Sequence, residues 1–323
     1  MPSADNSDVA AESPAAVRVE SRPLAYFYDA ELPPVLEVDS GAVLVFETVD
    51  ARDGSLAHHP TGSLFSLPRP DPGRGNPLTG PVAVTGTEPG DALVVDILAV
   101  ECGPAAWAGG HAHANPLIPG RIPESLGRSC QVTSEFVDYG AGIKLPASPM
   151  VGCIGTAPKD SKPSAGQPGR HGGNIDQPIV RAGTRVFLPV EVPGGLLFLG
   201  DVHAAQGDGE LSGTAFEVPA DVTVRVSVTK GLSLVWPWIL TDDRLAVMTS
   251  GVDFVEARYE AVEAMLSLIE RCLGLDPADG LALISVAGDL RVGQAYGGMD
   301  MTLRLEMPLL PGLELVPGMA HSK

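Results

Sequence analysis

Short apolar segments separated by turn residues dominate the chain from about Leu24 to Val228, and they constrain its fold more than any other feature. The segments are rich in β-branched residues and most follow a Gly, Pro or Asp, which is typical of β-strands. The clearest examples are Ala42–Phe46, Ala92–Leu98, Arg185–Val190, Leu196–Leu199 and Val222–Val228. No helical pattern of about 10–15 residues separates most of them, which argues against a parallel βαβ sheet. The sequence therefore predicts a mainly β fold.

The composition supports this prediction and excludes several partners. The chain has 38 Gly and 30 Pro, enough for many turns, and its hydrophobic content of 44% is typical of globular proteins. Its 323 residues can bury a sizeable core. Because the formal net charge is −19, we expect neither a nucleic acid nor an anionic membrane as partner.

The cysteines and the N-terminal residues favour a cytoplasmic protein. The 4 cysteines lie far apart with no zinc-binding spacing, so we expect free thiols in a reducing compartment. Residues 1–22 are polar and acidic and contain no apolar stretch of a signal peptide, which predicts a disordered tail. No apolar run reaches the ~18 residues that a membrane span needs.

A weak internal repeat runs through the β-rich part. Leu78–Gly80 followed by Asp91–Ile97 resembles Leu211–Gly213 followed by Asp221–Val226. Each copy follows an apolar strand that ends in polar residues, and the repeat places Asp50 opposite His203. Chance similarity between Gly/Val-rich strands is the alternative. We predict duplicated β-sandwich or jelly-roll-like units around a pseudo-twofold axis.

The pattern becomes helical after residue 236. Apolar residues recur at spacings of three and four between Asp253, a predicted N-cap, and Cys272, and Gly274 is a predicted stop. Asp276 and a following proline predict a second helix to about Leu290. Residues 301–306 alternate as a last strand. The fold class is thus mainly β (α+β): a tail at 1–22, a duplicated catalytic core at 23–230, and an α+β portion with a helical hairpin at 231–323, packed on the core.

Two segments concentrate polar residues suited to chemistry, Gly169–Asp176 and Gly200–Glu210. Asp201 and His203 are two positions apart at the end of an apolar strand, so they share one face of it. A carboxylate and an imidazole on one face can bind one cation, and zinc accepts both donors. Further donors follow in a Gly-spaced loop: Gln206, Asp208 and Glu210. A solvated turn is the alternative interpretation.

Several short segments, in order, resemble the acetamidase/formamidase family of amide hydrolases. They are Phe46–Asp50, Asn76–Pro81 with Glu88–Asp91, Met150–Gly155, His171–Asp176, Gly200–Glu210 and Ser285–Gln294. Together they cover roughly residues 24 to 300, and Gly200–Glu210 is the most specific of them.

The resemblance implies metal-assisted hydrolysis of small linear amides to ammonia and a carboxylate, on a β-rich fold with an α+β C-terminal part. By position, it implies that the polar strand ends and the two Gly-rich loops form the site. We predict as metal ligands Asp50, Asp201, His203 and Asp176. We predict as catalytic residues Glu210 (general base and acid), His171 (donor to the oxyanion), Asn174 (substrate orientation) and Asp208. The expected cofactor is Zn²⁺, with Ca²⁺ as a second or alternative ion.

Departures from the family pattern leave the substrate open. The stretch after Asp50 has no Gln and contains His58 and His59, and a second unexpected segment contains His111 and His113. These histidines are either exposed or extra ligands. The alternatives to a linear-amide hydrolase are a lactam or other C–N hydrolase, and a non-catalytic β-sandwich that binds a small ligand or Ca²⁺. We expect a small amide as partner, and a homodimer or higher homo-oligomer.

Overall fold

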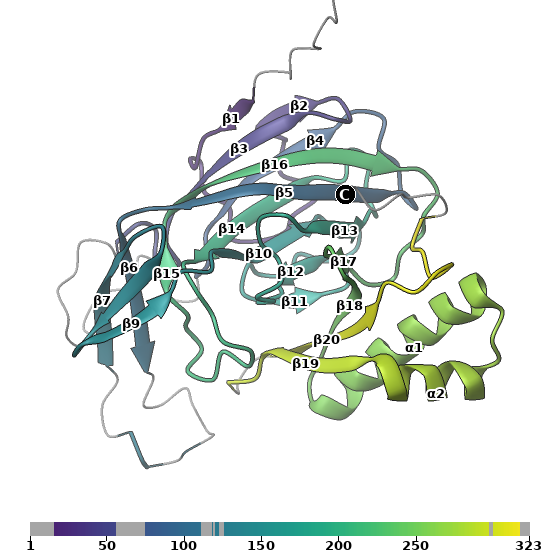
Figure 1. Ribbon diagram of the computed structural model, residues 1–323. Coiled ribbons are helices and arrows are strands. Elements are labelled where there is room, and N and C mark those ends of the chain that lie inside the picture. Colours follow the sequence, from purple (N-terminus) through teal and green to yellow (C-terminus); the bar gives the residue numbers. More distant parts are fainter. Residues whose placement is uncertain are drawn as a thin grey trace, which may run out of the picture.

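The computed structural model describes residues 16–55, 75–110, 118, 120–122, 126–296 and 300–316. Across these residues the chain is mainly β, and its strands form two large, mostly antiparallel sheets (Figure 1). The first sheet has nine strands. In spatial order they are β1 (Val17–Val19), β3 (Val43–Thr48), β16 (Ala220–Thr229), β5 (Ala92–Cys102), β13 (Arg185–Pro189), β17 (Trp238–Leu240), β18 (Arg244–Gly251), β20 (Met301–Pro308) and β19 (Asp289–Gln294).

The second sheet has eleven strands among the described residues. Nine follow one path: β11 (Pro168–Gly169), β12 (Gly172–Asn174), β10 (Met150–Thr156), β14 (Leu197–His203), β15 (Glu217–Val218), β6 (Ala105–Gly110), β7 (Leu126–Val132), β8 (Phe136–Gly140) and β9 (Ile143–Pro146). The other two lie off this path, since β4 (Leu78–Val84) pairs with β14 and with β2 (Leu36–Val38).

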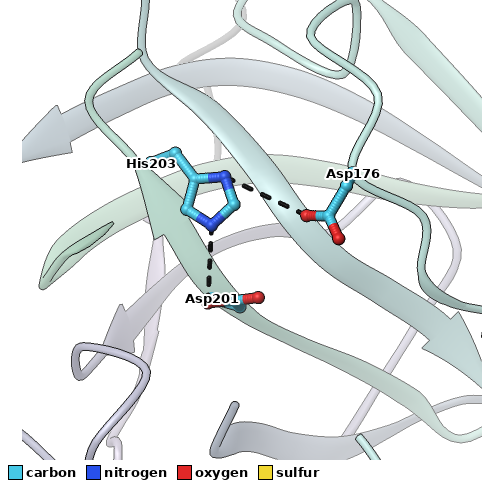
Figure 2. Close-up of side chains that lie close together, drawn as sticks. All are labelled: Asp176, Asp201 and His203. Carbon is cyan, nitrogen blue, oxygen red and sulfur yellow. Dashed lines mark ion pairs between the residues drawn. The ribbon is translucent and has the colours of Figure 1, made fainter. Parts of the chain in front are cut away.

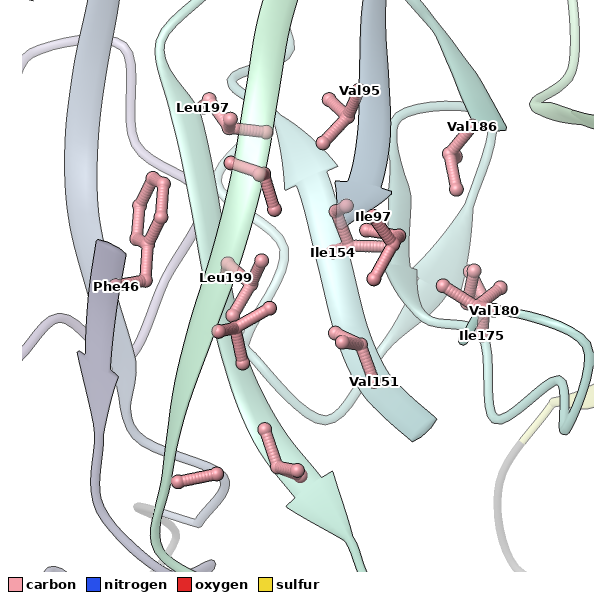
Figure 3. Close-up of a cluster of buried hydrophobic side chains, with 14 of the residues drawn as sticks. Phe46, Val95, Ile97, Val151, Ile154, Ile175, Val180, Val186, Leu197 and Leu199 are labelled. Atoms are coloured by element: carbon pink, nitrogen blue, oxygen red, sulfur yellow. The ribbon is translucent and has the colours of Figure 1, made fainter. Parts of the chain in front are cut away.

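The main hydrophobic core lies between these sheets. Figure 3 shows Phe46, Val95 and Ile97 from the first sheet among Ile154 and Leu199 from the second, all buried. Every residue of β10 and β14 is buried, because these strands are covered on both faces. Strands covered in this way are nearly continuous apolar runs rather than alternating ones. A polar residue in β14 is therefore enclosed by protein.

The strand pairing relates the two copies of the sequence repeat only in part. β5 and β16, which are equivalent strands of the two copies, pair antiparallel across a long ladder. β3 pairs with β16 in the first sheet, whereas β14, the equivalent of β3, pairs with β4 in the second sheet. Because these two pairings are not equivalent, the pseudo-twofold axis stays a prediction.

The helices form the predicted hairpin beside β18 and β20 (Figure 1). α1 (Phe254–Leu273) begins after Asp253, whose side chain accepts from two backbone N–H groups, and ends at Gly274 with φ 65°. α2 (Pro277–Ala287) begins after Asp276. The prediction that α2 continues to Leu290 is wrong. Residues 289–294 form β19 instead, because they pair with β20 at the sheet edge.

The predicted N-terminal tail also needs correction. Residues 17–19 form β1, which pairs in parallel with β3. Arg18 donates to the carboxylates of Glu47 and Asp221, each at 2.9 Å, and this contact holds the strand on the sheet edge. The C-terminal strands β17 to β20 continue the same sheet, so the 231–323 portion shares a sheet with the core.

The cysteines are free thiols, as expected. Burial raises the pKa of Cys102 and of Cys130 to about 11. Within the described ranges, no helix has the length and apolar character that crossing a membrane requires.

Candidate metal centre

The end of β14 places two of the predicted ligands inside the protein. Asp201 and His203 are 3% and 1% exposed, and Asp176, in the loop after β12, is 1% exposed. Figure 2 shows the imidazole between the two carboxylates, with the His203 Nε2 atom 3.5 Å from Asp201 Oδ1 and the Nδ1 atom 4.0 Å from Asp176 Oδ1. The structure thus brings these three predicted residues together.

Hydrogen bonding determines which nitrogen of His203 is free. Gln206 Nε2 donates to the carbonyl oxygens of Asp176 and Gly293 at 2.8 and 3.2 Å. These two bonds set the orientation of the amide, so that its oxygen, Oε1, faces His203. That oxygen lies 2.8 Å from His203 Nδ1. Because an amide oxygen can only accept, Nδ1 carries a proton, and Nε2 is the nitrogen that can bind a cation once its own proton is lost. Outer contacts of this kind orient metal-binding histidines.

Glu217 is a site residue that the sequence interpretation missed. It stands in β15 directly opposite His203 in the ladder, and its Oε2 atom lies 3.2 Å from His203 Nε2. The backbone N–H of Ala215 donates to the other oxygen, Oε1, at 2.9 Å. A carboxylate between the apolar residues Phe216 and Val218 was the signal in the sequence.

Four buried atoms of this cluster lack a hydrogen-bond partner within the described part of the chain: Asp176 Oδ1, Asp201 Oδ1, His203 Nε2 and Glu217 Oε2. Unsatisfied buried polar atoms cost free energy, so several in one place indicate a missing ligand. Two overlapping groups of ligand atoms, each within 4.8 Å of one another, could hold an ion: Asp176, Asp201 and His203, and His203, Glu210 and Glu217. The residues therefore fit a divalent cation with mixed N and O ligands.

The charges lead to the same conclusion. Burial raises the pKa of Asp176 and Glu210 well above the ordinary range, and also raises that of Glu217. Burial alone would lower the pKa of His203, but Glu217 and Asp201 raise it well above normal. So many carboxylates in one buried space cannot all stay ionised without positive charge between them. Protons or a cation must supply it.

A glycine on the neighbouring strand makes room for the cluster. A Cβ atom at Gly152 in β10 would lie 2.7 Å from Asp176 Oδ1, 2.7 Å from the Asp201 carbonyl oxygen and 3.0 Å from His203 Cε1. Real Cβ atoms essentially never approach other atoms below 3.0 Å. The absence of a side chain at Gly152 therefore leaves the space that the cluster occupies.

Backbone strain is concentrated here. Asp176, Asp201, Glu210 and Asn76 have φ values of 44°, 52°, 40° and 53°, in the left-handed region. Such conformations cost about 1–3 kcal/mol for residues other than Gly and cluster at functional sites. The strain at the three acids is consistent with side chains fixed for binding.

An amide network holds Asp201 from behind. Asn76 Nδ2 donates to Asp201 Oδ2 at 2.7 Å and to Asn174 Oδ1 at 3.2 Å. The buried Cys153 thiol also donates to Asn174 Oδ1, at 3.0 Å. Asn174 Nδ2 donates in turn to Gln294 Oε1 at 3.3 Å. The predicted site residue Asn174 thus belongs to this network, which fixes Asp201.

Asp208 and Glu210 both lie in the loop after β14 and line the same cavity, but their carboxylates have different surroundings. Asp208 forms a two-point ion pair with Arg304 of β20, with N–O distances of 2.6 and 2.9 Å. Glu210 lines a cavity of about 400 Å³ together with Gln206 and Leu211. Of these two acids, only Glu210 is in a group that could hold an ion.

The remaining predicted residues lie apart from these groups. Asp50 is buried, and its Oδ1 atom accepts from the backbone N–H groups of Arg52 and Gly54 at 2.9 and 3.1 Å. His171 packs edge-on against Tyr28, with 4.7 Å between ring centroids, and burial lowers its pKa to about 4. The four loop histidines lie outside the described residues: His58, His59, His111 and His113.

The fold and the site together define a mainly β protein with a buried cluster of Asp, His and Glu side chains that could hold a cation. The sequence model of the acetamidase/formamidase family matches residues 15–165 and 164–240. The chain belongs to this family.

Solved structures with similar sequences have the same fold. An acetamidase from Bacillus halodurans is 33% identical with a TM-score of 0.86, over 91% of this chain and 97% of that one. A predicted acetamidase/formamidase from Thermoanaerobacter tengcongensis is 30% identical with a TM-score of 0.85, over 91% and 95%. A putative formamidase of Schizosaccharomyces pombe is 27% identical over 62% of each chain. The match therefore spans less than two thirds of this curated relative.

Proposed function

We propose that the protein hydrolyses small linear amides to ammonia and a carboxylate, with a divalent cation in the metal centre. The observation that carries the proposal is the convergence of unpartnered ligand atoms from Asp176, Asp201, His203 and Glu217. Membership of an amidase family supports it, as do the acetamidases and formamidases among the similar proteins.

Zinc is the cation that this donor set favours. His203 Nε2 with Asp201 Oδ1 and Glu217 Oε2 would hold it, with Asp176 as a further oxygen donor. Calcium is the alternative, but it prefers oxygen donors and an imidazole argues against it. A bound divalent cation supplies Lewis acidity, which activates water near neutral pH and polarises a carbonyl.

Glu210 is our general base and acid. It lines the open cavity and also reaches the metal centre, so it lies where substrate and attacking water meet. Burial, together with the nearby Asp176 carboxylate, raises its pKa. A carboxylate with a raised pKa can take a proton from the attacking water and then give it to the leaving nitrogen. That transfer matters because the amide anion is a poor leaving group.

Other predicted residues have supporting roles in this proposal. Asn174 holds Asp201 through the amide network rather than contacting substrate. Asp208 holds the catalytic loop against β20 through Arg304. His171 has a buried Nε2 atom without a hydrogen-bond partner in the described residues, but it packs against Tyr28 and does not line the cavity beside Glu210, so its role as donor to the oxyanion stays a prediction. We also propose a homodimer or higher homo-oligomer, and a cytoplasmic location that keeps the thiols reduced.

The test combines metal analysis with an assay of ammonia release. We expect about one zinc per chain and ammonia from formamide, acetamide or propionamide, lost with a chelator and restored by Zn²⁺. A γ-lactam in the same assay distinguishes ring opening from linear-amide hydrolysis. A metal-loaded protein that releases no ammonia from any amide would overturn the proposal, and activity that survives complete metal removal would overturn the role of the cation.

A further inference from the structure

Trp107 in β6 carries a buried hydrogen-bond donor that no step of the proposed hydrolysis uses. The residue is 2% exposed, and its indole Nε1 atom has no hydrogen-bond partner among the described residues. An indole N–H can only donate, so a cation cannot satisfy it. Because an unpaired buried donor costs free energy, this atom indicates that a bound molecule supplies an acceptor beside it.

Strand register places Trp107 in one row with the metal centre. Trp107 is the cross-strand partner of Glu217, and Glu217 is the cross-strand partner of His203. Residues directly opposite each other on antiparallel strands point to the same face, so the three side chains share one face of the sheet. Neighbouring strands are ~4.8 Å apart, so the backbones at the two ends of the row are about 10 Å apart. An indole and an imidazole together can span that separation.

A glycine determines where the indole lies. A Cβ atom at Gly109, two residues further along β6, would overlap with Trp107 Cη2 and lie 2.7 Å from Cζ2. The indole therefore extends along this face of the strand over Gly109. Thr214, in the loop between β14 and β15, holds the same glycine, because its Oγ1 atom accepts from the N–H at 3.1 Å and donates to the carbonyl oxygen at 2.8 Å. Trp107 is thus fixed beside Glu217 and beside the loop that carries Glu210.

Trp107 and Glu217 stand opposite each other without a hydrogen bond between their side chains. Trp107 Nε1 is a donor and Glu217 Oε2 is an acceptor, yet both atoms are unpartnered within the described part of the chain. If the two side chains only held each other, this bond would be formed. Glu217 Oε2 lies instead 3.2 Å from His203 Nε2, among the atoms that could hold a cation. The Trp107 donor is left for an oxygen atom of a molecule bound next to that cation.

We infer that Trp107 is a further catalytic residue, whose indole N–H donates to the carbonyl oxygen of the substrate amide. This inference rests on the proposed amide hydrolysis. Attack of water on the carbonyl carbon moves an electron pair onto the carbonyl oxygen, and a fixed donor in a buried site stabilises the charge that develops there. Trp107 thus takes the role for which the sequence predicts His171.

The indole N–H signal of Trp107 in a proton–nitrogen correlation spectrum gives a test that needs no turnover. The chain has 3 tryptophans, and the signal that is lost in Trp107→Phe belongs to Trp107. In the zinc-loaded Glu210→Gln protein, acetamide should move this signal downfield, because an oxygen acceptor joins the N–H. The Trp236 signal is the internal control and should stay in place, since its Nε1 atom already donates to Glu260 at 2.9 Å. A Trp107 signal that acetamide leaves unmoved would contradict the inference.

Kinetics of two matched variants separate this role from packing. Trp107→Phe keeps a ring and removes the donor, and Trp238→Phe makes the same change in β17, at a buried residue of the hydrophobic cluster beneath the helices. Both should lower Tm, but only Trp107→Phe should lower kcat for acetamide, by about 10²–10³-fold. Its zinc content should equal that of the wild type, because no ligand atom changes. If Trp107→Phe does not fold, the benzothienyl analogue of tryptophan at this position, with sulfur in place of N–H, gives the same comparison.

The outcomes distinguish this inference from the proposed function. A Trp107→Phe protein with wild-type kcat would overturn the inference and leave amide hydrolysis intact. Loss of zinc from Trp107→Phe, with no movement of the indole signal, would indicate a bond to Glu217 and would also overturn it. If the zinc-loaded wild type hydrolyses none of the amides, the proposed function fails and the inference fails with it.

Discussion

Asn76 and Asp201 lie 125 positions apart in the sequence, yet their side chains are joined by a hydrogen bond of 2.7 Å. The bond occupies Asp201 Oδ2 and leaves Oδ1 for the metal centre, 3.5 Å from His203 Nε2. The carboxylate thus has one oxygen for orientation and one for binding.

Replacing Asn76 should weaken metal binding without changing a ligand. Asn76→Gly suits the left-handed backbone at φ 53° and removes the side chain that donates to Asp201. We expect the zinc affinity to fall about 10–100-fold, as for other outer contacts of metal ligands. Competition with a chromogenic chelator measures this. Asn76→Ala should show the same loss and also a lower Tm, because alanine is strained at this φ. Unchanged zinc affinity in both variants would contradict the role of Asn76.

Gly152→Ala should damage the centre more than its small size suggests. The new Cβ atom would lie within 2.7 Å of Asp176 Oδ1 and of the Asp201 carbonyl oxygen, so the cluster must move. We expect loss of bound zinc and destabilisation of about 1–3 kcal/mol, by elemental analysis and urea unfolding. Gly110→Ala in β6 is the matched control, because no atom of the described residues lies within 4 Å of a Cβ atom there. A fully zinc-loaded Gly152→Ala protein would show that the space is not needed.

Glu210→Gln separates proton transfer from metal binding. The amide keeps the size of the side chain but cannot act as a base, so we expect kcat to fall about 10²–10⁴-fold. The zinc content should stay at the wild-type level, because the unpartnered atoms belong to the other four residues of the cluster. Normal turnover in this variant would remove Glu210 from the mechanism. Loss of zinc instead would make it a metal ligand.

Asp208 and Arg304 should matter for stability more than for chemistry. Arg304 is 4% exposed and also donates to Glu306 and Gln177. Arg304→Met leaves the buried Glu306 carboxylate unpaired, and we expect destabilisation of about 3–5 kcal/mol. Asp208 has a side chain that is 37% exposed, so Asp208→Asn should cost only about 1 kcal/mol and lower kcat less than about tenfold. Loss of activity in Asp208→Asn as large as in Glu210→Gln, with zinc retained, would identify Asp208 as catalytic.

His171 should make the folded protein less stable in mild acid. Burial lowers its pKa from 6.5 to about 4. The unfolded chain therefore binds more protons between these pH values, and stability falls as the pH drops from 6.5 toward 4. The contribution is on the order of 2–3 kcal/mol at the acid end. Urea unfolding across this range, with a chelator to exclude metal release, should show a smaller pH dependence for His171→Phe, which keeps a ring against Tyr28. Equal pH dependence in both proteins would contradict this assignment.

The sequence predicts the fold well wherever the signal is local. Asp253, Gly274 and Asp276 mark the helix ends correctly, because capping depends on a few neighbouring residues. The end of α2 and the strand at residues 17–19 are predicted wrongly, because pairing with β20 and with β3 decides them. Those contacts join residues far apart in the sequence.

In the site, too, the residues with a local sequence signal are predictable and those brought in by long-range contacts are not. Asp201 and His203 are predictable because they share one strand face at a spacing of two. Glu217 and Asn76 come to the centre from other elements, through strand register and a loop crossing, which no local pattern records. Asp50 has an equivalent position in the repeat, but its carboxylate accepts from the following turn. A pseudo-symmetric position in the fold therefore need not carry the same function.

The loop after β14 packs on the C-terminal strands β19 and β20, and this contact has a consequence for when the metal centre can form during synthesis. Gln206 reaches the carbonyl of Gly293, and Asp208 needs Arg304, about a hundred residues downstream. A nascent chain that ends before residue 289 holds every proposed metal-binding side chain but lacks β19 and β20, the hairpin that anchors their loop. We therefore expect tight metal binding only after β19 and β20 have been synthesised and have paired.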